Sequence, residues 1–254
     1  MGIKKHLEQV GGEDRPNKLA DVVLPAEQER IINVRDSIDQ KDVDALKRSI
    51  INGQSKRFSN LLSLKILDPD NFDQFVEENI SIDEMVGELR QKFEGGDDSF
   101  EFRLRELGCL RLLFPDLAVS FRGFIEDCDW NFSPTLDSTS EIDIYRLANL
   151  KLISSKYFEK NVVLTEGCWK KGKQLIDLNI KSDHIAATII VALRLKILFP
   201  DKEVFNNKEI GRLVDAFNVA KDKESICGKN RLLAELILLS ADKIEMTDGG
   251  LKII

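Results

Sequence analysis

A seven-residue pattern that recurs five times along the chain limits the possible folds more than any other feature of the sequence. Each copy starts with Leu and continues through apolar and basic positions, and the clearest copies end in Pro-Asp. The proline or its equivalent falls at positions 69, 115, 155, 200 and 241, which are 46, 40, 45 and 41 residues apart. This even spacing indicates a structural repeat of about forty residues. The copies begin at Leu64, Leu110, Leu150, Leu195 and Leu236.

Each copy of the pattern closes a segment with helical apolar spacing, as in residues 104–113. The Pro-Asp ends this helix A, because proline disfavours helical geometry in the residue before it and lacks a backbone donor. A second segment with charges between its apolar residues follows and predicts helix B. Ser81 with Glu84, and Asn206 with Glu209, form capping-box patterns at the start of two such segments. We expect helix A inside and the more polar helix B outside.

Helix pairs that are apolar on more than one side must stack on one another to bury their surfaces. We therefore predict an all-α fold, a right-handed α-solenoid of about four and a half helix-pair repeats of 40–46 residues with a short helical N-terminal region. Residues 1–57 lack the repeat and are expected to cap the array, and residues 58–254 form the repeat domain. Two short helices are expected in the first region, from Pro25 to Asp36 and from Lys41 to Ile51.

The repeat length resembles that of HEAT and armadillo α-solenoid proteins over residues 58–254. This resemblance rests on the period. It implies a scaffold or adaptor that presents a concave face of successive helices, and it carries over no functional residue. The last copy continues into an apolar tail, residues 248–254, which could pack back on the array or meet a partner.

Composition narrows the function classes further. The chain has 254 residues, of which 43% are hydrophobic and 32% charged, as in ordinary globular proteins. Its apolar stretches are far shorter than the roughly 20 residues that span a bilayer, and no secretory signal opens the chain. We therefore expect a cytoplasmic protein without membrane contact. The four cysteines and two histidines form no metal-binding spacing, so neither a metal nor a cofactor is expected.

Four basic residues occupy the same place in four copies of the pattern, and a regular stack would align them as a basic ladder on one face. A ladder of this kind could bind a partner. The alternative is that each cation lies in the last turn of a helix A, where it stabilises the negative end of the helix dipole and pairs with a nearby aspartate. The ladder residues are Lys65, Arg111, Lys151 and Lys196.

A second candidate is the cluster of Trp169, Lys170, Lys171 and Lys173, an aromatic residue among cations. Such a cluster could stack a nucleic-acid base and hold a phosphate. The alternative is that Trp169 packs inward from a helix B whose lysines form its solvated face. The formal net charge of -7 disfavours binding to nucleic acid, which is a polyanion.

For catalysis the best pair in the sequence is Asp183 with His184, and Asp183 is better explained as a helix cap. The leading hypothesis is therefore a protein–protein interaction scaffold with a protein partner and no catalytic residues. A nucleic-acid-associated helical repeat that uses the ladder and the Trp169 cluster is the alternative. An enzyme with an unrecognised site stands third, and the oligomeric state stays open.

Overall fold

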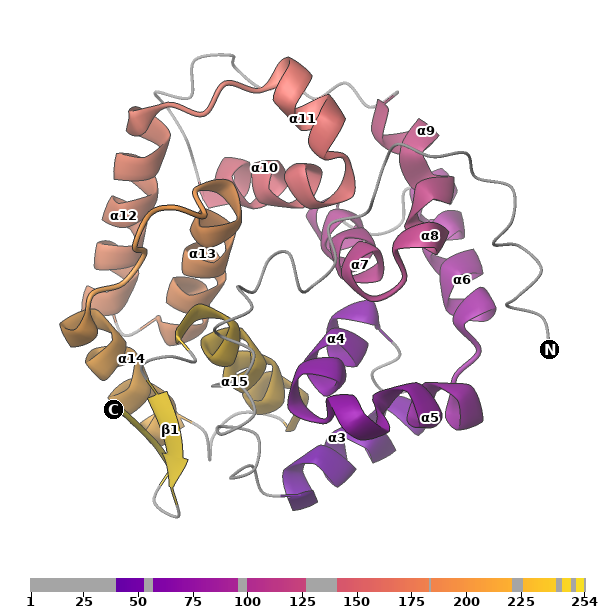
Figure 1. The fold of residues 1–254 in the computed structure, drawn as a ribbon, viewed down its shortest axis with the longest axis horizontal. Helices are drawn as coiled ribbons and strands as arrows, with labels where there is room; N and C mark the ends of the chain where they lie inside the picture. The colour runs from indigo at the N-terminus through magenta and orange to yellow at the C-terminus, as the bar shows by residue number, and fades with distance from the viewer. Residues whose placement is uncertain are drawn as a thin grey trace.

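Helices make up nearly all of the chain that the computed structural model describes, namely residues 40–52, 57–95, 100–126, 141–182, 184–220, 226–240, 244–247 and 250–253 (Figure 1). The predicted helical class is confirmed for these residues, with one β-hairpin added. The helices that end in the repeated pattern are α4 (Phe58–Leu67), α7 (Phe100–Leu113), α10 (Glu141–Ile153), α13 (Ile185–Leu198) and α15 (Ile226–Ser240). The helices that precede them are α3 (Gln40–Ile51), α6 (Ile82–Gly95), α9 (Arg122–Glu126), α12 (Glu166–Lys181) and α14 (Asn207–Ala220).

The five helices that end in the repeated pattern form a closed inner ring (Figure 1). Each packs against the next in chain order, from α4 through α7, α10 and α13 to α15, and α15 packs against α4. In an open solenoid the first and last repeats stay apart. Here they touch, so the inner surfaces of the helices face a shared interior and do not form the open concave face that we expected.

The division into inner and outer helices follows from the distribution of apolar side chains. Eight of the ten residues of α4 are buried, because the helix contacts neighbours on most of its circumference. In α6, by contrast, Met85 and Leu89 are the buried residues among fourteen. A one-sided helix of this kind covers the core with one face and leaves the other to solvent. The predicted arrangement, with helix A inside and helix B outside, is confirmed.

A short extra helix follows three of the inner helices directly. These helices are α5 (Pro69–Asn79), α8 (Pro115–Ala118) and α11 (Ser155–Asn161), and α8 continues through the 3-10 turn η2 (Val119–Phe121). Pro69 and Pro115 end one helix and begin the next, because a proline in the first turn needs no backbone donor. The sequence predicted the break at the proline, but not this additional helix.

Side-chain caps fix where several outer helices begin. Asn206 and Glu209 bond reciprocally at the start of α14, with N···O distances of 3.0 and 2.8 Å, as the capping-box pattern predicts. At the start of α6, the Glu84 amide donates to the Ser81 hydroxyl at 3.4 Å. The Thr165 hydroxyl caps α12 in the same way.

The N-terminal helix α3 confirms the helix that was expected over residues 41–51 and lies against both α4 and α15. It therefore connects the first and the last inner helices. Asp42 contributes polar contacts to this connection, because its carboxylate pairs with Lys229 and its carbonyl accepts a hydrogen bond from the Asn230 amide at 3.2 Å. The other helix expected in this region, Pro25 to Asp36, lies outside the described residues.

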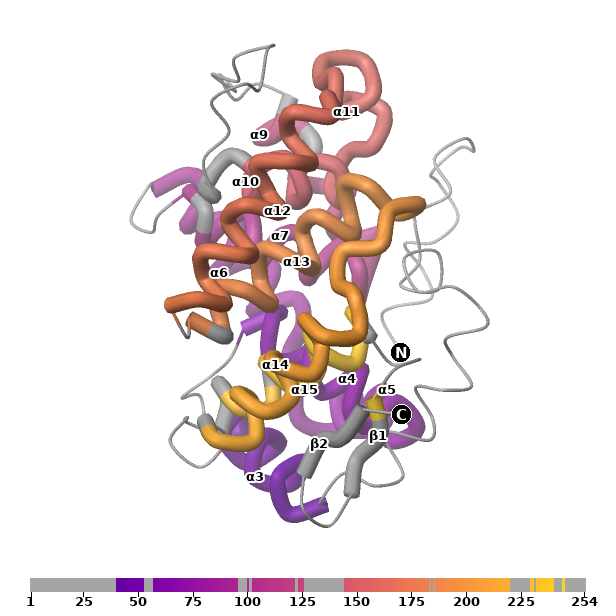
Figure 2. The backbone as a smooth tube through the Cα atoms, turned by 90° about the vertical axis from the view of Figure 1, so that its left-hand side faces the viewer, coloured from indigo at the N-terminus to yellow at the C-terminus, as the bar shows by residue number. Residues whose placement is uncertain are grey.

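The C-terminal segment forms an antiparallel hairpin of β1 (Ile244–Thr247) and β2 (Gly250–Ile253), in which Ile244 pairs with Ile253. These strands were not predicted from the sequence. Strand β2 lies against α14, so the apolar tail packs back on the array, one of its two expected outcomes. Helix α3 lies at the opposite end of the molecule from α11 (Figure 2). Among the described helices, none is long and apolar enough to cross a membrane.

Candidate functional site

The four ladder residues lie in the last turns of four inner helices, as their common place in the repeat predicts. Two of them reach the next inner helix. The Lys151 ammonium donates to the Leu198 carbonyl at 3.1 Å, and the Lys196 ammonium donates to the Leu238 carbonyl at 3.2 Å. Carbonyls at the end of a helix lack partners within that helix. Each of these lysines therefore satisfies the end of its neighbour and favours the negative end of that helix dipole.

The other two ladder residues have partners within their own repeat. The Lys65 ammonium lies 2.9 Å from the Asp73 carboxylate and 4.7 Å from the centre of the Phe72 ring. The Arg111 guanidinium donates to the Pro115 carbonyl at 2.9 Å. All four cations thus contact the chain itself, which fits the helix-end interpretation. Binding of a partner by the ladder stays a prediction.

Burial also changes the pKa of one ladder residue, Lys151. Desolvation lowers the pKa of the Lys151 ammonium from its ordinary value, and the nearby carboxylates Glu159 and Asp201 oppose that shift. Asp201 belongs to the repeat that follows Lys151. The neighbouring repeats therefore interact through charges as well as through apolar contacts.

The aromatic and basic cluster of α12 is divided between the core and solvent. The Trp169 ring packs edge-on against Phe199, with ring centres 5.5 Å apart. The Lys202 ammonium lies 5.1 Å from the centre of the Trp169 ring and pairs with Glu166. A residue outside the predicted cluster thus lies over the Trp169 ring, where it would compete with a stacking base.

The three lysines of this cluster do not act together. Lys173 turns toward α14, where its ammonium lies 3.1 Å from the Glu209 carboxylate and 2.6 Å from the Val204 carbonyl. Lys170 and Lys171 are exposed on α12. Two of the four predicted residues are thus exposed surface cations, and the nucleic-acid interpretation of the cluster stays a prediction.

The interior of the ring holds polar groups that the sequence analysis missed. One sequence signal could have revealed them: the residue just before the first leucine of each copy carries a polar group or a thiol in every repeat. Side chains from four helices meet inside the ring: Cys109 from α7, Tyr145 from α10, Arg194 from α13 and Glu235 from α15. Arg194 stacks on the Tyr145 ring at 5.0 Å, and the Cys109 thiol interacts electrostatically with Arg194 and Glu235. The residues that precede the first leucine in the five copies are Ser63, Cys109, Asn149, Arg194 and Glu235.

The pKa of the Cys109 thiol shows how strongly burial acts on a group in this interior. Burial raises the pKa of the Cys109 thiol to about 12, and the negative charge of Glu106 acts in the same direction. A thiol in such surroundings stays protonated and is a poor nucleophile.

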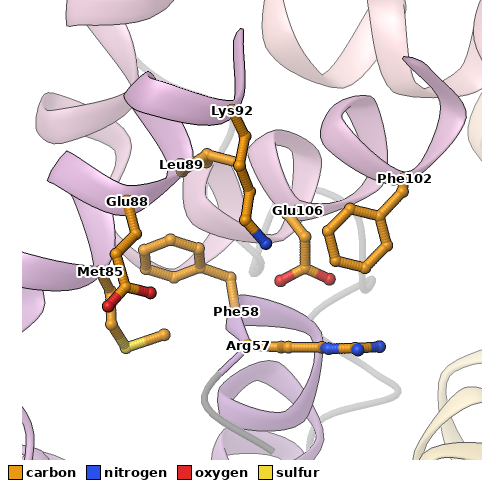
Figure 3. Close-up of a pocket in the computed structure, with 8 residues that line it drawn as sticks. All are labelled: Arg57, Phe58, Met85, Glu88, Leu89, Lys92, Phe102 and Glu106. Carbon is orange, nitrogen blue, oxygen red and sulfur yellow. The ribbon is translucent and has the colours of Figure 1, made fainter. Parts of the chain in front are cut away.

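A shallow cleft opens between the start of α4, one face of α6 and the first half of α7 (Figure 3). The space within it is about 30 Å³, which is enough to hold a water molecule. Glu88 and Met85 lie at one end of the cleft and Phe102 at the other (Figure 3). The lining side chains are Arg57, Phe58, Met85, Glu88, Leu89, Lys92, Phe102 and Glu106.

Glu106 holds the floor of the cleft in place. It is only 3% exposed, and its carboxylate accepts bonds from the Ser59 hydroxyl at 2.8 Å and from the Ser59 amide at 3.4 Å. Arg57, which precedes α4, supplies no side-chain cap to that helix. A carboxylate from α7 thus takes the place of a local cap at the positive end of α4.

Three cations from three different places in the chain surround the Phe102 ring. The guanidinium carbons of Arg57 and Arg105 both lie 5.0 Å from its centre, and the Lys92 ammonium lies 5.1 Å from it. Arg105 also contacts the Glu106 carboxylate at 3.5 Å. The Phe102 ring therefore lies among cations from the start of α4, from α6 and from α7, which it attracts through its π face.

No group of three or more His, Cys, Asp or Glu side chains that could hold a metal ion occurs within the described ranges. Comparison with models of protein families, with curated proteins and with solved structures found no match for this chain.

Proposed function

We propose that this protein is a cytoplasmic scaffold that binds a protein partner and carries out no catalysis of its own. We propose further that its repeats are a right-handed α-solenoid of the HEAT or armadillo kind whose first and last inner helices have come into contact. The repeated helix pairs and their common helix-end contacts support this relationship. A ring of this kind would hold surface features contributed by different repeats in fixed relative positions.

The observation that carries the proposal is the composition of the cleft between α4, α6 and α7. Its lining combines the exposed Arg57 and the half-buried Phe102 with Phe58 and Met85, which are buried beneath them. Aromatic residues, methionine and arginine are the types enriched in protein–protein interfaces. The cleft has both signs of charge, with the Glu106 carboxylate in its floor, and this mixture suits a partner side chain better than it suits a uniformly charged polymer.

The nucleic-acid alternative draws less support. It requires the ladder and the Trp169 cluster, and most of their cations contact the chain's own carbonyls and carboxylates. To bind phosphates, Lys151 and Lys196 would have to release the helix ends that they satisfy.

The test is affinity capture with the tagged full-length chain from a lysate of its native cells, with and without nuclease, followed by mass spectrometry. The scaffold proposal predicts the same retained proteins in both arms. Loss of the retained proteins on nuclease treatment would favour the nucleic-acid alternative. Retention of no protein above the level of an untagged control would contradict the scaffold proposal.

A further inference from the structure

We propose that helix α3 is a strap that holds the five inner helices closed as a ring, and that its detachment from α15 opens the array at the joint between α15 and α4. Helix α3 belongs to no repeat and lies outside the ring, against α4 and α15 (Figure 1). Its buried side chains, Val43, Leu46 and Ile50, lie along one face of the helix. Because α3 contacts both ends of the array, it can control their separation.

The joint that closes the ring lacks a contact that two other joints have. From α10 to α13 and from α13 to α15, a lysine of one helix donates to a carbonyl at the end of the next. In the fifth copy, the corresponding position is Ile237, which is fully buried. The cation at the end of α4 comes from α3 instead, because Lys47 lies 2.6 Å from Asp68, the C-cap residue of α4. Helix α3 thus supplies the contact that the last repeat omits.

The two sides of the strap differ in their access to water. On α15, the Asp42 carboxylate pairs with Lys229, and the Asp42 carbonyl accepts a hydrogen bond from Asn230 at 3.2 Å. The side chains of the Lys229–Asp42 pair are 23% and 32% exposed. Those of the Lys47–Asp68 pair on α4 are 20% and 10% exposed. A charge pair that water reaches contributes little to stability, so the α15 side should detach first while α3 stays on α4.

Closure of the ring also buries polar atoms that an open array would expose to water. Within the part of the chain that the structure describes, Nε of Arg194 in α13 and Oδ1 of Asn230 in α15 are buried and lack a hydrogen-bond partner. A buried polar group without a partner costs free energy, and water can satisfy it once the array opens. This cost opposes closure, so loss of the strap shifts the balance toward the open array.

Opening would give a partner access to the inner faces of the helices. In the closed ring these faces meet in a shared interior, where Arg194 stacks on Tyr145. Solenoid proteins use the concave side of the array as an extended binding surface. For the scaffold proposed above, α3 would therefore regulate access to a second binding surface. That role rests on the proposed function, whereas the opening of the ring does not depend on it.

The experiment compares amide hydrogen exchange and small-angle X-ray scattering of the full chain with those of the variant Asp42→Lys. This substitution places a second cation beside Lys229 and repels α3 from α15. We expect exchange at least about fivefold faster in α15 and α4, a change of less than about twofold in α10, and a larger radius of gyration. The charge swap Asp42→Lys/Lys229→Asp should bring both helices back to within about twofold of the wild type, because it recreates the pair with its signs exchanged.

The matched control is Asp44→Lys, which makes the same change of charge on the same helix. Asp44 accepts a hydrogen bond from Gln40 within α3 at 3.0 Å, so its replacement leaves the pair between Asp42 and Lys229 in place. Exchange in α15 and α4 should stay within about twofold of the wild type, because a pair on the surface of one helix contributes little. If Asp42→Lys does not fold, Asp42→Asn removes the charge without adding repulsion and should accelerate exchange in the same two helices.

Wild-type exchange and an unchanged radius of gyration in Asp42→Lys would overturn the proposal. Equal acceleration in α10 would also overturn it, because α3 would then stabilise the whole fold and not the closing joint. A charge swap that fails to restore α15 and α4 would have the same meaning. These results are separable from failure of the scaffold proposal. A ring that stays closed and still retains nuclease-resistant partners would leave the scaffold in place, and an opening ring that retains none would contradict the scaffold alone.

Discussion

A close approach between the outer helix α12 and the inner helix α13 is made possible by one glycine, Gly172 in α12. A Cβ added there would lie 2.5 Å from Cδ2 and 2.9 Å from Cγ of Leu195, which is fully buried in α13. Because Leu195 has no room to move away, Gly172→Ala should lower the free energy of unfolding by about 1–3 kcal/mol through overpacking. Urea denaturation measures this change.

The matched control is Gly87→Ala in α6, where no atom lies within 4 Å of an added Cβ. Alanine is favoured over glycine in a helix interior by about 0.5–1 kcal/mol, so this variant should be as stable as the wild type or more stable. A stabilising effect of both substitutions would contradict the view that contact with Leu195 requires glycine at position 172.

Single residues also mark how much of the candidate site can be predicted from sequence. The repeat predicts that Lys151 and Lys196 lie at helix ends, because that follows from their place in a local pattern. It does not predict their acceptors, which belong to the next inner helix. The cleft is beyond local patterns altogether, since its cations come from separate elements and meet only through packing.

At the scale of elements, the end of α4 is tied to α3 by the Lys47–Asp68 pair, at 2.6 Å. Burial would raise the pKa of the Asp68 carboxyl, but hydrogen bonds from Lys47 and from Asn71, the latter at 2.8 Å, outweigh it and hold that pKa below its ordinary value of 3.8. A carboxyl with a depressed folded pKa stabilises the fold above its unfolded pKa and loses that effect as the pH falls through the folded value.

Asp68→Asn should therefore lower the free energy of unfolding at neutral pH by about 1–3 kcal/mol, because it removes a hydrogen bond between charged groups. The difference from the wild type should shrink as the pH falls below 3.8. Urea denaturation of both proteins from about pH 7 to about pH 2.5 measures this trend. A constant difference over that range would show that the carboxylate charge has no part in joining α3 to α4.

Elements with local signals are the ones that the sequence predicts well. The inner helices, their ends at Pro69 and Pro115 and the cap of α14 all follow from apolar spacing, proline and capping residues. The short helices after the breaks were missed because a proline that ends one helix can equally begin another. The hairpin was missed because eight strand residues in two short runs carry too little periodicity to predict strands.

At the scale of the whole molecule, the contact between α15 and α4 is the feature that the sequence predicted least. The curvature of a repeat array is the sum of small rotations between neighbours. No single repeat encodes that sum, so the period alone does not predict whether five copies form an arc or a ring. The residues that join the ends, Asp42 with Lys229 and Asn230, are far apart in sequence and belong to no repeated position.

A closed ring predicts that α4 depends on the C-terminal helix. In an open array, loss of α15 would expose α13 and leave α4 unaffected, because interactions in such arrays act between nearest neighbours. In the ring α15 contacts both α13 and α4. Amide hydrogen exchange on a variant that ends at residue 225 should therefore show lower protection in both α4 and α13 than in the full chain, and a smaller change in α10, which contacts α7 and α13. Undiminished protection of α4 would mean that the ends of the array are independent in solution.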